Sequence, residues 1–312
     1  MKALSVLHPV LAIVLAPLLQ GIIQRVKAWF AGRSGPPLLQ SYRDLARLLR
    51  KGAVFSRTTT WVFRAAAPVV LATTLGALTL LPAGGLPALL PFQGDFLLLV
   101  YLLALGRFAL ILAALDTGSS FEGMGASREA AFGALAEPAV LLGLAAAIRA
   151  TGELSLTGIT ASAGSGGWNA SSPALLLVVV SMLAVFLAEN ARIPVDDPNT
   201  HLELTMIHEA LILEYSGRHL ALIEWAAALK LFAYSCAGLA IFFPWGIAEA
   251  RDHVALLWAL PALAVKLAVG GFALAFIETI LAKMRIFRVP EFLATAFLLG
   301  VLAILVHLLL GA

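Results

Sequence analysis

The chain has 312 residues, of which 61% are hydrophobic and only 12% are charged. A soluble domain carries about 25% charged residues, so this composition excludes an ordinary soluble enzyme. The net charge of +3 comes from basic residues in a few loops between apolar runs. This pattern indicates membrane orientation rather than nucleic-acid binding. The single cysteine, Cys236, excludes a disulfide framework and any iron–sulfur cluster held by this chain alone.

Apolar runs of membrane-spanning length follow one another along the whole chain. A bilayer core of about 30 Å needs about 20 apolar residues in a helix. We therefore predict an all-α integral membrane protein, organised as a single polytopic domain over 1–312. The eight predicted spans lie near 3–27, 61–81, 95–116, 132–150, 173–189, 219–243, 254–282 and 291–311.

The segment 36–51, between the first two spans, has the pattern of an interfacial amphipathic helix. Two prolines are followed by leucines at helical spacing, with arginines on the other faces. Such a helix can be a connector anchored among lipid headgroups, or one wall of a lipid-accessible site.

Basic residues gather in the loops after the first and seventh spans. Because short cytoplasmic loops collect Lys and Arg, these loops are expected in the cytoplasm. Both termini are then predicted on the non-cytoplasmic side, which agrees with an even number of spans.

Three cations lie near the middle of predicted spans: Arg107, Lys230 and Lys266. A charge at that depth costs about 2.5–3.5 kcal/mol on insertion scales and usually faces the bundle interior. The spans place Glu137, Glu224 and Glu278 in the cytoplasmic half as carboxylate partners. A hydrated proton path is the interpretation we favour, and fixed ion pairs that hold the helices together are the alternative.

The densest polar segment is the predicted cytoplasmic loop 189–218. Its ionisable side chains include Glu189, Arg192, Asp196, Asp197, His201, Glu203, His208, Glu209 and Glu214. The loop also carries many apolar residues, so we expect it to fold against other structure. No metal site is predicted, because these His and Glu residues lack the His-Glu-x-x-His spacing that places two imidazoles on one helix face.

This loop contains a succession of motifs: Glu189-Asn-Ala-Arg192-Ile-Pro194-Val-Asp196-Asp197-Pro198, then His201-Leu-Glu203-Leu, then Glu214-Tyr215-Ser216-Gly217. The succession resembles the loop between the fifth and sixth helices of subunit 1 of respiratory complex I. That loop reads approximately Glu-x-x-Arg-x-Pro-Phe-Asp, Glu-x-Glu-Leu and Glu-Tyr-Ser-Gly.

The sequence is more similar still to the formate hydrogenlyase subunit 4 branch, the corresponding membrane subunit of group 4 nickel-iron hydrogenases. Val195 stands in place of the Phe, a second Asp and a Pro follow Asp196, and a longer spacer precedes Glu214. The segment 121–129 and the sequence Leu135-Ala-Glu137-Pro138 resemble the same branch.

The resemblance implies a membrane anchor on which a peripheral redox arm docks. Expected partners are hydrogenase-type large and small subunits, an iron–sulfur subunit and antiporter-like membrane subunits. No cofactor is expected on this chain alone, because its partners would hold the iron–sulfur clusters and the nickel-iron centre. Quinone binding stays open. The implied location is the inner (plasma) membrane.

The predicted site has two groups of residues and no catalytic residue in this chain. The proton-path or coupling group is Glu129, Glu137, Glu189, Asp196, Asp197, Glu203, Glu209, Glu214, Glu224, Lys230, Lys266 and Glu278. The loop-positioning group is Arg128, Arg192, His201 and His208. We expect Arg192 to be held by Asp196 or Glu203, and Glu137 or Glu278 to bridge Glu224 and Lys230.

The function predicted first is therefore a proton-coupling membrane subunit of a nickel-iron hydrogenase complex of formate hydrogenlyase or energy-converting type. One alternative is the quinone-chamber subunit of an NADH-quinone oxidoreductase. Another, of a different class, is a stand-alone ion transporter. The absence of a visible internal repeat speaks against this last alternative.

Overall fold

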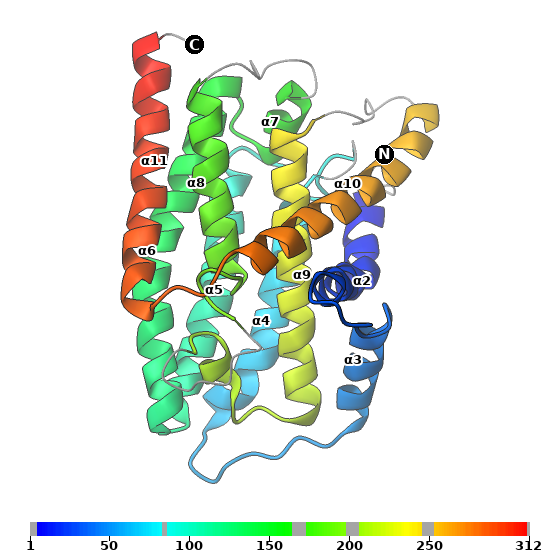
Figure 1. The fold of residues 1–312 in the computed structure, drawn as a ribbon, viewed down its shortest axis with the longest axis vertical. Helices are drawn as coiled ribbons and strands as arrows, with labels where there is room; N and C mark the ends of the chain where they lie inside the picture. Colours follow the sequence, from blue (N-terminus) through cyan, green and yellow to red (C-terminus); the bar gives the residue numbers. More distant parts are fainter. Residues whose placement is uncertain (1–4, 83–85, 164–172, 198–205, 245–252, 311–312) are drawn as a thin grey trace.

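The computed structural model describes residues 5–82, 86–163, 173–197, 206–244 and 253–310, which form a bundle of long helices (Figure 1). The helices are α2 (Leu7–Phe30), α3 (Gln40–Arg50), α4 (Trp61–Leu80), α5 (Asp95–Asp116), α6 (Ser120–Thr151), α7 (Leu156–Ser162), α8 (Pro173–Glu189), α9 (Gly217–Phe242), α10 (His253–Ile280) and α11 (Val289–Leu310). Two short 3-10 turns, η2 (Glu209–Ile212) and η3 (Ile286–Arg288), lie in the loops.

Within the described residues, seven helices are long and apolar enough to cross a membrane: α2, α4, α5, α6, α9, α10 and α11. The apolar helix α8 is shorter, with 17 residues, and stands beside α11 in the same bundle. The protein is thus an all-helical, multi-pass membrane protein, and α8 coincides with the predicted segment 173–189.

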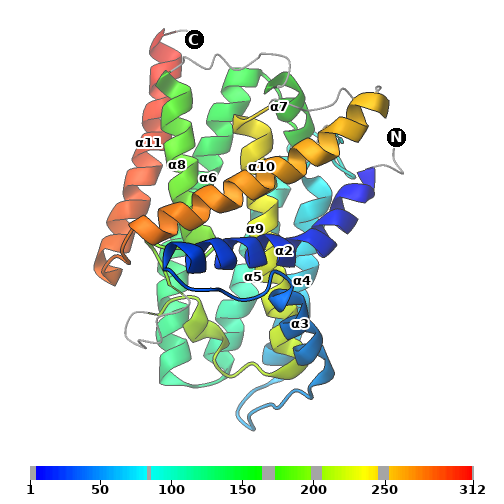
Figure 2. The same cartoon turned by 45° about the vertical axis from the view of Figure 1, so that its right-hand side comes forward.

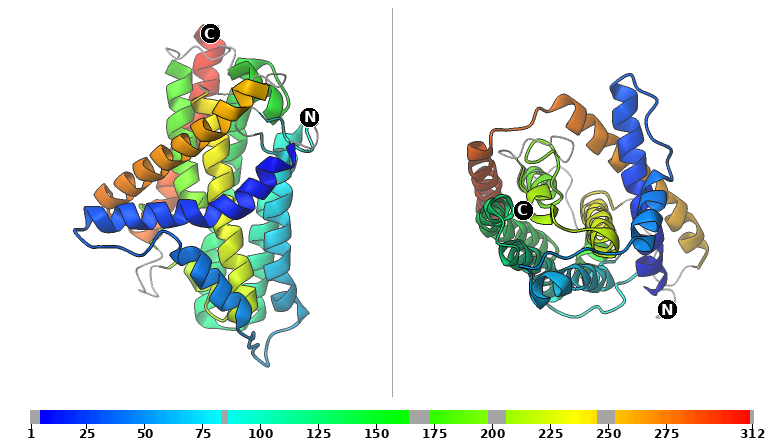
Figure 3. Two further views of the ribbon diagram at one scale, coloured as in Figure 1. Left: turned by 90° about the vertical axis from the view of Figure 1, so that its right-hand side faces the viewer. Right: turned by 90° about the horizontal axis from the view of Figure 1, so that it is seen from below.

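The helices differ in their tilt. In Figures 2 and 3, α4, α5, α6, α8, α9 and α11 run roughly along the long axis, whereas α2 and α10 cross it obliquely on one side. α10 packs mainly on α2, and α8 packs on α11 and α6. Both chain ends lie at the end of the bundle opposite to α3 and the following loop (Figure 1).

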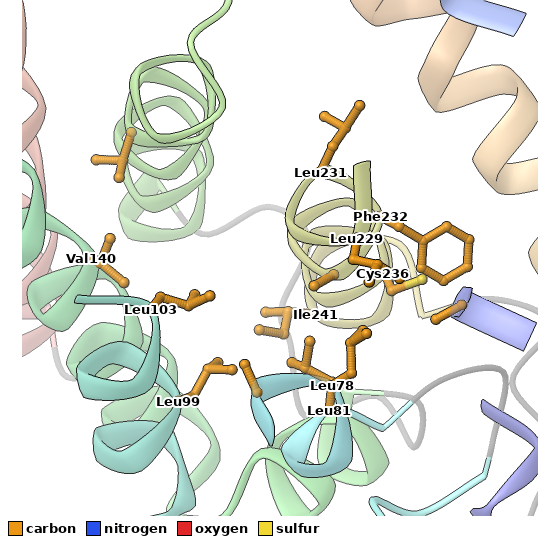
Figure 4. Close-up of a cluster of buried hydrophobic side chains, with 14 of the residues drawn as sticks. Leu78, Leu81, Leu99, Leu103, Val140, Leu229, Leu231, Phe232, Cys236 and Ile241 are labelled. Atoms are coloured by element: carbon orange, nitrogen blue, oxygen red, sulfur yellow. The ribbon is translucent and has the colours of Figure 1, made fainter. Parts of the chain in front are cut away.

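The core is built largely from Leu and Ala side chains, which let the helices approach closely. Its main cluster joins α4, α5, α6 and α9, and Figure 4 shows Leu103 and Ile241 facing each other across the space between α5 and α9. Lipid tails are as apolar as these side chains, so van der Waals contact and shape hold such helices together rather than a hydrophobic driving force.

Two elements differ from the predicted spans. The fourth span is predicted over 132–150, but α6 begins at Ser120. Its first turns pack against η2, where a Cβ on Gly125 would lie 2.8 Å from the Ala210 Cβ. The helix α7 is not predicted at all. It is capped by Ser155, whose hydroxyl accepts from the Gly158 amide, and by Asp95, which accepts from the Leu156 amide at 2.8 Å.

Candidate functional site

The centre of the candidate site is Arg107, in the middle of α5 and only 9% exposed. Each of its nitrogens meets a different carboxylate. Nε lies 3.4 Å from Glu129, Nη1 lies 3.0 Å from Glu137, and Nη2 contacts Glu189. Arg107 thereby joins α5 to α6 and to the end of α8. The planar guanidinium suits this role because its donors point in fixed, divergent directions.

Glu189 extends this contact to the next cation. Its second oxygen lies 2.9 Å from Lys230 Nζ on α9, and its side chain also interacts with Tyr234, one turn further along α9. Arg107 and Lys230, which the sequence places at similar depth on different spans, therefore share one buried carboxylate. The result is a continuous chain of ion pairs across α6, α5, α8 and α9.

The identity of this bridging residue differs from the expectation. Glu137 or Glu278 was expected to bridge Glu224 and Lys230, but Glu189 is the residue that contacts Lys230. Glu137 is committed to Arg107, and Glu278 lies in another cluster. Span positions along the sequence give depth in the membrane. They do not determine which helices are neighbours, and this is why the expectation was wrong.

A close approach of α5 to α6 holds Arg107 in place. Gly133 is the residue of α6 that faces Arg107, and a Cβ built there would overlap Nη1 and lie 3.1 Å from Cδ. Only a residue without a side chain leaves room for the guanidinium at this point.

Glu278, near the end of α10, forms a second cluster. It is buried and lies 2.8 Å from Lys27 Nζ of α2 and 3.4 Å from Arg192 Nη1. Arg192 is therefore held by a carboxylate, as expected, but the carboxylate comes from α10 rather than from Asp196. Glu203, the other expected partner, lies outside the described residues. Glu278 thus links α10 both to the oblique helix α2 and to the loop 189–218, called the acidic loop below.

Asp196 connects separate parts of the loop. It is buried and accepts from the amides of Ile207 and His208 at 3.3 and 3.1 Å, and from Lys283 Nζ at 3.0 Å. Asp196 thus ties the start of the loop to its later part and to the connection between α10 and α11.

The later part of the loop is fixed from α6. Arg128 Nη1 donates to the Met206 carbonyl at 2.8 Å. Buried Glu122 accepts from the Glu214 amide at 3.0 Å, while the Glu214 side chain is exposed. Tyr215 stacks on Phe63 at 4.0 Å and donates its hydroxyl to the Phe63 carbonyl. Burial, together with Glu122 and Asp116, raises the pKa of Tyr215, so the hydroxyl keeps the proton that it donates.

A cavity of about 550 Å³ lies between α2, α9 and the loop. Its ionisable lining residues are Lys27, Arg192, Asp196, His208, Glu209 and Glu224. A smaller cavity of about 80 Å³ reaches Arg107, Glu189 and Lys230. His208 and Asn190 are among the residues that line both cavities, so the larger cavity adjoins the one that reaches the buried ion pairs.

The remaining predicted site residues are Lys266, His201, Glu203 and Asp197. Lys266 donates to the Phe243 carbonyl at 2.7 Å, at the end of α9 away from the loop. It therefore does not continue the path from Lys230. His201 and Glu203 lie outside the described residues. Asp197 lies next to Asp196, whose side chain accepts from the Asp197 amide.

Several residues of the site were absent from the prediction: Lys27, Glu122, Gly133, Tyr234 and Lys283. Glu122 lies in the predicted motif segment 121–129, so its position beside Arg128 and Glu129 was an available signal. Lys27 and Lys283 sit at span ends, where basic residues are common for orientation alone. Nothing in the sequence distinguishes their role as carboxylate partners.

In the part of the chain that the structure describes, no group of three or more His, Cys, Asp or Glu side chains is arranged to hold a metal ion. Cys236 is buried in α9 among apolar side chains.

Comparison with known proteins gives relatives over nearly the whole chain. The model of a family described as NADH dehydrogenase matches residues 1–309. Formate hydrogenlyase subunit 4 of Escherichia coli K12 is 36% identical over 292 residues, which cover 92% of this chain and 94% of that protein. Hydrogenase-4 component C of the same organism is 32% identical, with 94% and 92% covered.

Two further similarities have lower sequence identity. One subunit of the NADH-quinone oxidoreductase of Rubrobacter xylanophilus is 28% identical, with 70% of this chain and 67% of that protein covered. A chain in the structure of a membrane-bound sulfane sulfur reductase, an archaeal respiratory membrane complex, superposes with a TM-score of 0.80 at 21% identity. It covers 96% of this chain and 98% of its own length, and at this identity it shows the fold alone.

Proposed function

This chain belongs to the NADH dehydrogenase family, and we propose that it is the proton-coupling membrane subunit of a nickel-iron hydrogenase complex. The two hydrogenase-type relatives support this choice, because they match at 36% and 32% identity over more than nine-tenths of the chain. The quinone-type relative covers only 70% of the chain at 28% identity. Val195 and the second Asp at position 197 belong to the same hydrogenase-type pattern.

The observation that carries a coupling role is the contact of Glu189 with both Arg107 and Lys230. Glu129, Glu137 and Glu189 give three negative charges against the two positive charges of Arg107 and Lys230, a formal balance of −1. One added proton makes this cluster neutral. Because its members are in contact, a change of charge at one end of the cluster acts electrostatically on the other end, and this is the basis of the proposed coupling.

The acidic loop is the part that would pass a change in the partners to this cluster. Its described segments are held by Asp196, Arg128 and Glu122, and His208 lies in the wall between the two cavities. Exposed Glu214 and Leu213 follow η2 on the outside of the same segment. We propose that peripheral redox subunits dock on this surface and that antiporter-like membrane subunits receive the coupled ion.

The redox centres would belong to those partners. With one buried cysteine in its sequence, this chain does not fit nickel or a cluster as a ligand set, and we derive no step through them. Bound in partner subunits, they would supply the electron transfer. The residues of this chain hold the loop, exclude lipid from the charged cluster and keep Glu189 in contact with both Arg107 and Lys230.

The first test is the composition of the native assembly. Purified from its own membranes, the complex should contain nickel and iron and should evolve hydrogen with a reduced donor. A complex without nickel that reduces quinone would overturn this proposal. That result would support the second candidate, a quinone-chamber subunit, which the cavity of about 550 Å³ beside the loop also favours.

The second test separates coupling from mere structural support. Glu189→Gln keeps the shape of the side chain and removes its charge, and Lys230→Met removes the partner cation. We expect each variant to assemble and to transfer electrons to an artificial acceptor, but to lose coupled turnover. Glu153→Gln, an exposed carboxylate beyond the end of α6, is the matched control and should behave as wild type.

Coupling and structural support are distinguished by which property is lost, coupled turnover or assembly of the complex. Failed assembly of both variants would indicate fixed ion pairs, because a buried charge left without its partner costs about 3–5 kcal/mol. In that case the double variant Glu189→Gln/Lys230→Met should restore assembly. Undiminished coupled turnover in both single variants would reject the proposed path.

A further inference from the structure

A second cavity, separate from the polar one, lies between α8, α9 and α10. It has a volume of about 340 Å³, at the small end of the range for ligand pockets. α5 and α6 form its floor, and Figure 4 shows Leu99, Leu103 and Val140 on this floor with Ile241 opposite.

The chemistry of the lining excludes a water file or an ion. The lining is aliphatic or aromatic except for Tyr234 and Ser235. Ser235 donates its hydroxyl to the Leu231 carbonyl at 2.8 Å, and Tyr234 interacts with Glu189. An apolar cavity of this kind offers water no partners. A suitable occupant must need no hydrogen bond.

The cavity has an opening toward the membrane. Leu183 of α8 and Phe243 at the end of α9 line it and are also 42% and 50% exposed. α10, which crosses in front of α8 and α9 in Figure 2, supplies another wall of the cavity. In a membrane, the medium outside these helices consists of acyl chains.

The length of the cavity matches one lipid leaflet. Its wall on α9 runs from Ala233 to Phe243. Ten helical residues rise about 15 Å, which is half of a hydrocarbon core of about 30 Å. A transmembrane helix has a diameter of about 10–12 Å and would need far more room.

We propose that this cavity binds one acyl chain of a phospholipid from the leaflet on the side of the chain termini. The headgroup would lie at the Phe243 end, where Lys266 donates to the Phe243 carbonyl. The chain end would rest against Tyr234, next to the buried ion pairs. The bound acyl chain fills the space between α10 and the helices α8 and α9. It also keeps water out of the space beyond Glu189.

Glycines in the wall give a direct test. A Cβ on Gly238 would meet no atom within 4 Å, and one on Gly270 would meet only Leu239, at 3.9 Å. The Cβ of Gly238→Leu or Gly270→Leu would therefore meet no close contact, and the rest of the leucine side chain would take up volume in the cavity. Leucine is also a better helix former than glycine. Val269→Leu adds volume to the same helix at a residue that is 62% exposed and outside the cavity.

The full complex is incubated in its membranes with phosphatidylethanolamine that carries a diazirine in one acyl chain, and is then illuminated. In wild type and Val269→Leu we expect labelling of peptides that contain Met182, Phe186 or Ala237. Gly238→Leu and Gly270→Leu should lose this labelling, while their thermal stability in detergent is maintained.

Equal labelling of all variants, or labelling confined to exposed residues such as Phe272, would overturn the proposal. So would extraction of an isoprenoid quinone instead of phospholipid from the purified complex. Cross-linking of a partner's transmembrane helix to the cavity walls would do the same.

Discussion

Gly133 faces the guanidinium of Arg107 across the contact of α6 with α5, and a methyl group there would overlap Nη1. Arg107 has little freedom to retreat, because Nη2 donates to Glu189 and Nε lies 3.4 Å from Glu129. At the scale of single residues, the geometry of the ion-pair chain thus depends on glycine, which has no side chain, at position 133.

We therefore predict that Gly133→Ala destabilises the protein and impairs coupled turnover. Alanine in a helix gains about 0.5–1 kcal/mol over glycine. Loss of a buried ion-pair partner costs about 3–5 kcal/mol, and displacing Arg107 incurs part of this cost. The net effect of Gly133→Ala on stability is therefore destabilising. Thermal unfolding in detergent and hydrogen evolution coupled to ion transport would measure it.

Gly123→Ala is the matched control on the same helix, because a Cβ there meets no atom within 4 Å. It should be neutral or slightly stabilising. If Gly133→Ala behaved like Gly123→Ala, Arg107 would have room to move, and the fixed geometry described for its contacts would be wrong.

The residues of this cluster show what a sequence can and cannot predict. Arg107 and Lys230 stand out because a cation in the middle of an apolar run is costly. Glu189 was predicted as a site residue only as the first charge of a loop. Its contact with both cations follows from α8 ending between α5 and α9, which no spacing along the chain reveals.

At the scale of elements, the start of α9 is fixed against the segment that follows α3. Gly217, the first residue of α9, has a φ of 53°, and a Cβ there would overlap the Gly52 carbonyl oxygen and lie 3.0 Å from the Lys51 carbonyl oxygen. Ser216 accepts from the Val54 amide at 2.9 Å. The segment after α3 and the end of the acidic loop are therefore joined by a close approach of their backbones and by the Ser216 hydroxyl.

We predict that Gly217→Ala lowers the unfolding temperature of the purified protein. A residue with a Cβ in the left-handed region costs about 1–2 kcal/mol, and the overlap with the Gly52 backbone adds to this cost. Gly52→Ala, on the other side of the contact, meets no atom within 4 Å and should have little effect. Similar melting curves for the two variants would contradict the close contact described between Gly217 and the Gly52 backbone.

The sequence predicts the membrane spans better than the other helical segments, for a physical reason. A bilayer forces each span to be a long apolar run, so such runs mark the spans. The first turns of α6 and the short helix α7 have no such constraint. Their helical structure depends on contacts with η2 and on capping by Asp95, which are tertiary.

At the scale of the whole molecule, the two ends of the bundle differ in charge. The loop between α3 and α4 lies at one end and the connection of α6 to α7 at the other (Figure 1). The first of these carries Lys51 and Arg57, and short basic loops stay in the cytoplasm. We propose that both termini and the connection at Glu153 lie on the non-cytoplasmic side.

Cysteine accessibility tests this orientation, because the one natural cysteine, Cys236, is only 1% exposed and should give little background. Arg57 and Glu153 are both exposed, so a cysteine at either position should react readily. In intact spheroplasts, a membrane-impermeant maleimide should label Glu153→Cys. It should label Arg57→Cys only after the membrane is permeabilised. The reverse pattern would place the acidic loop outside the cell, away from any cytoplasmic redox partner, and would remove the basis of the proposed coupling role.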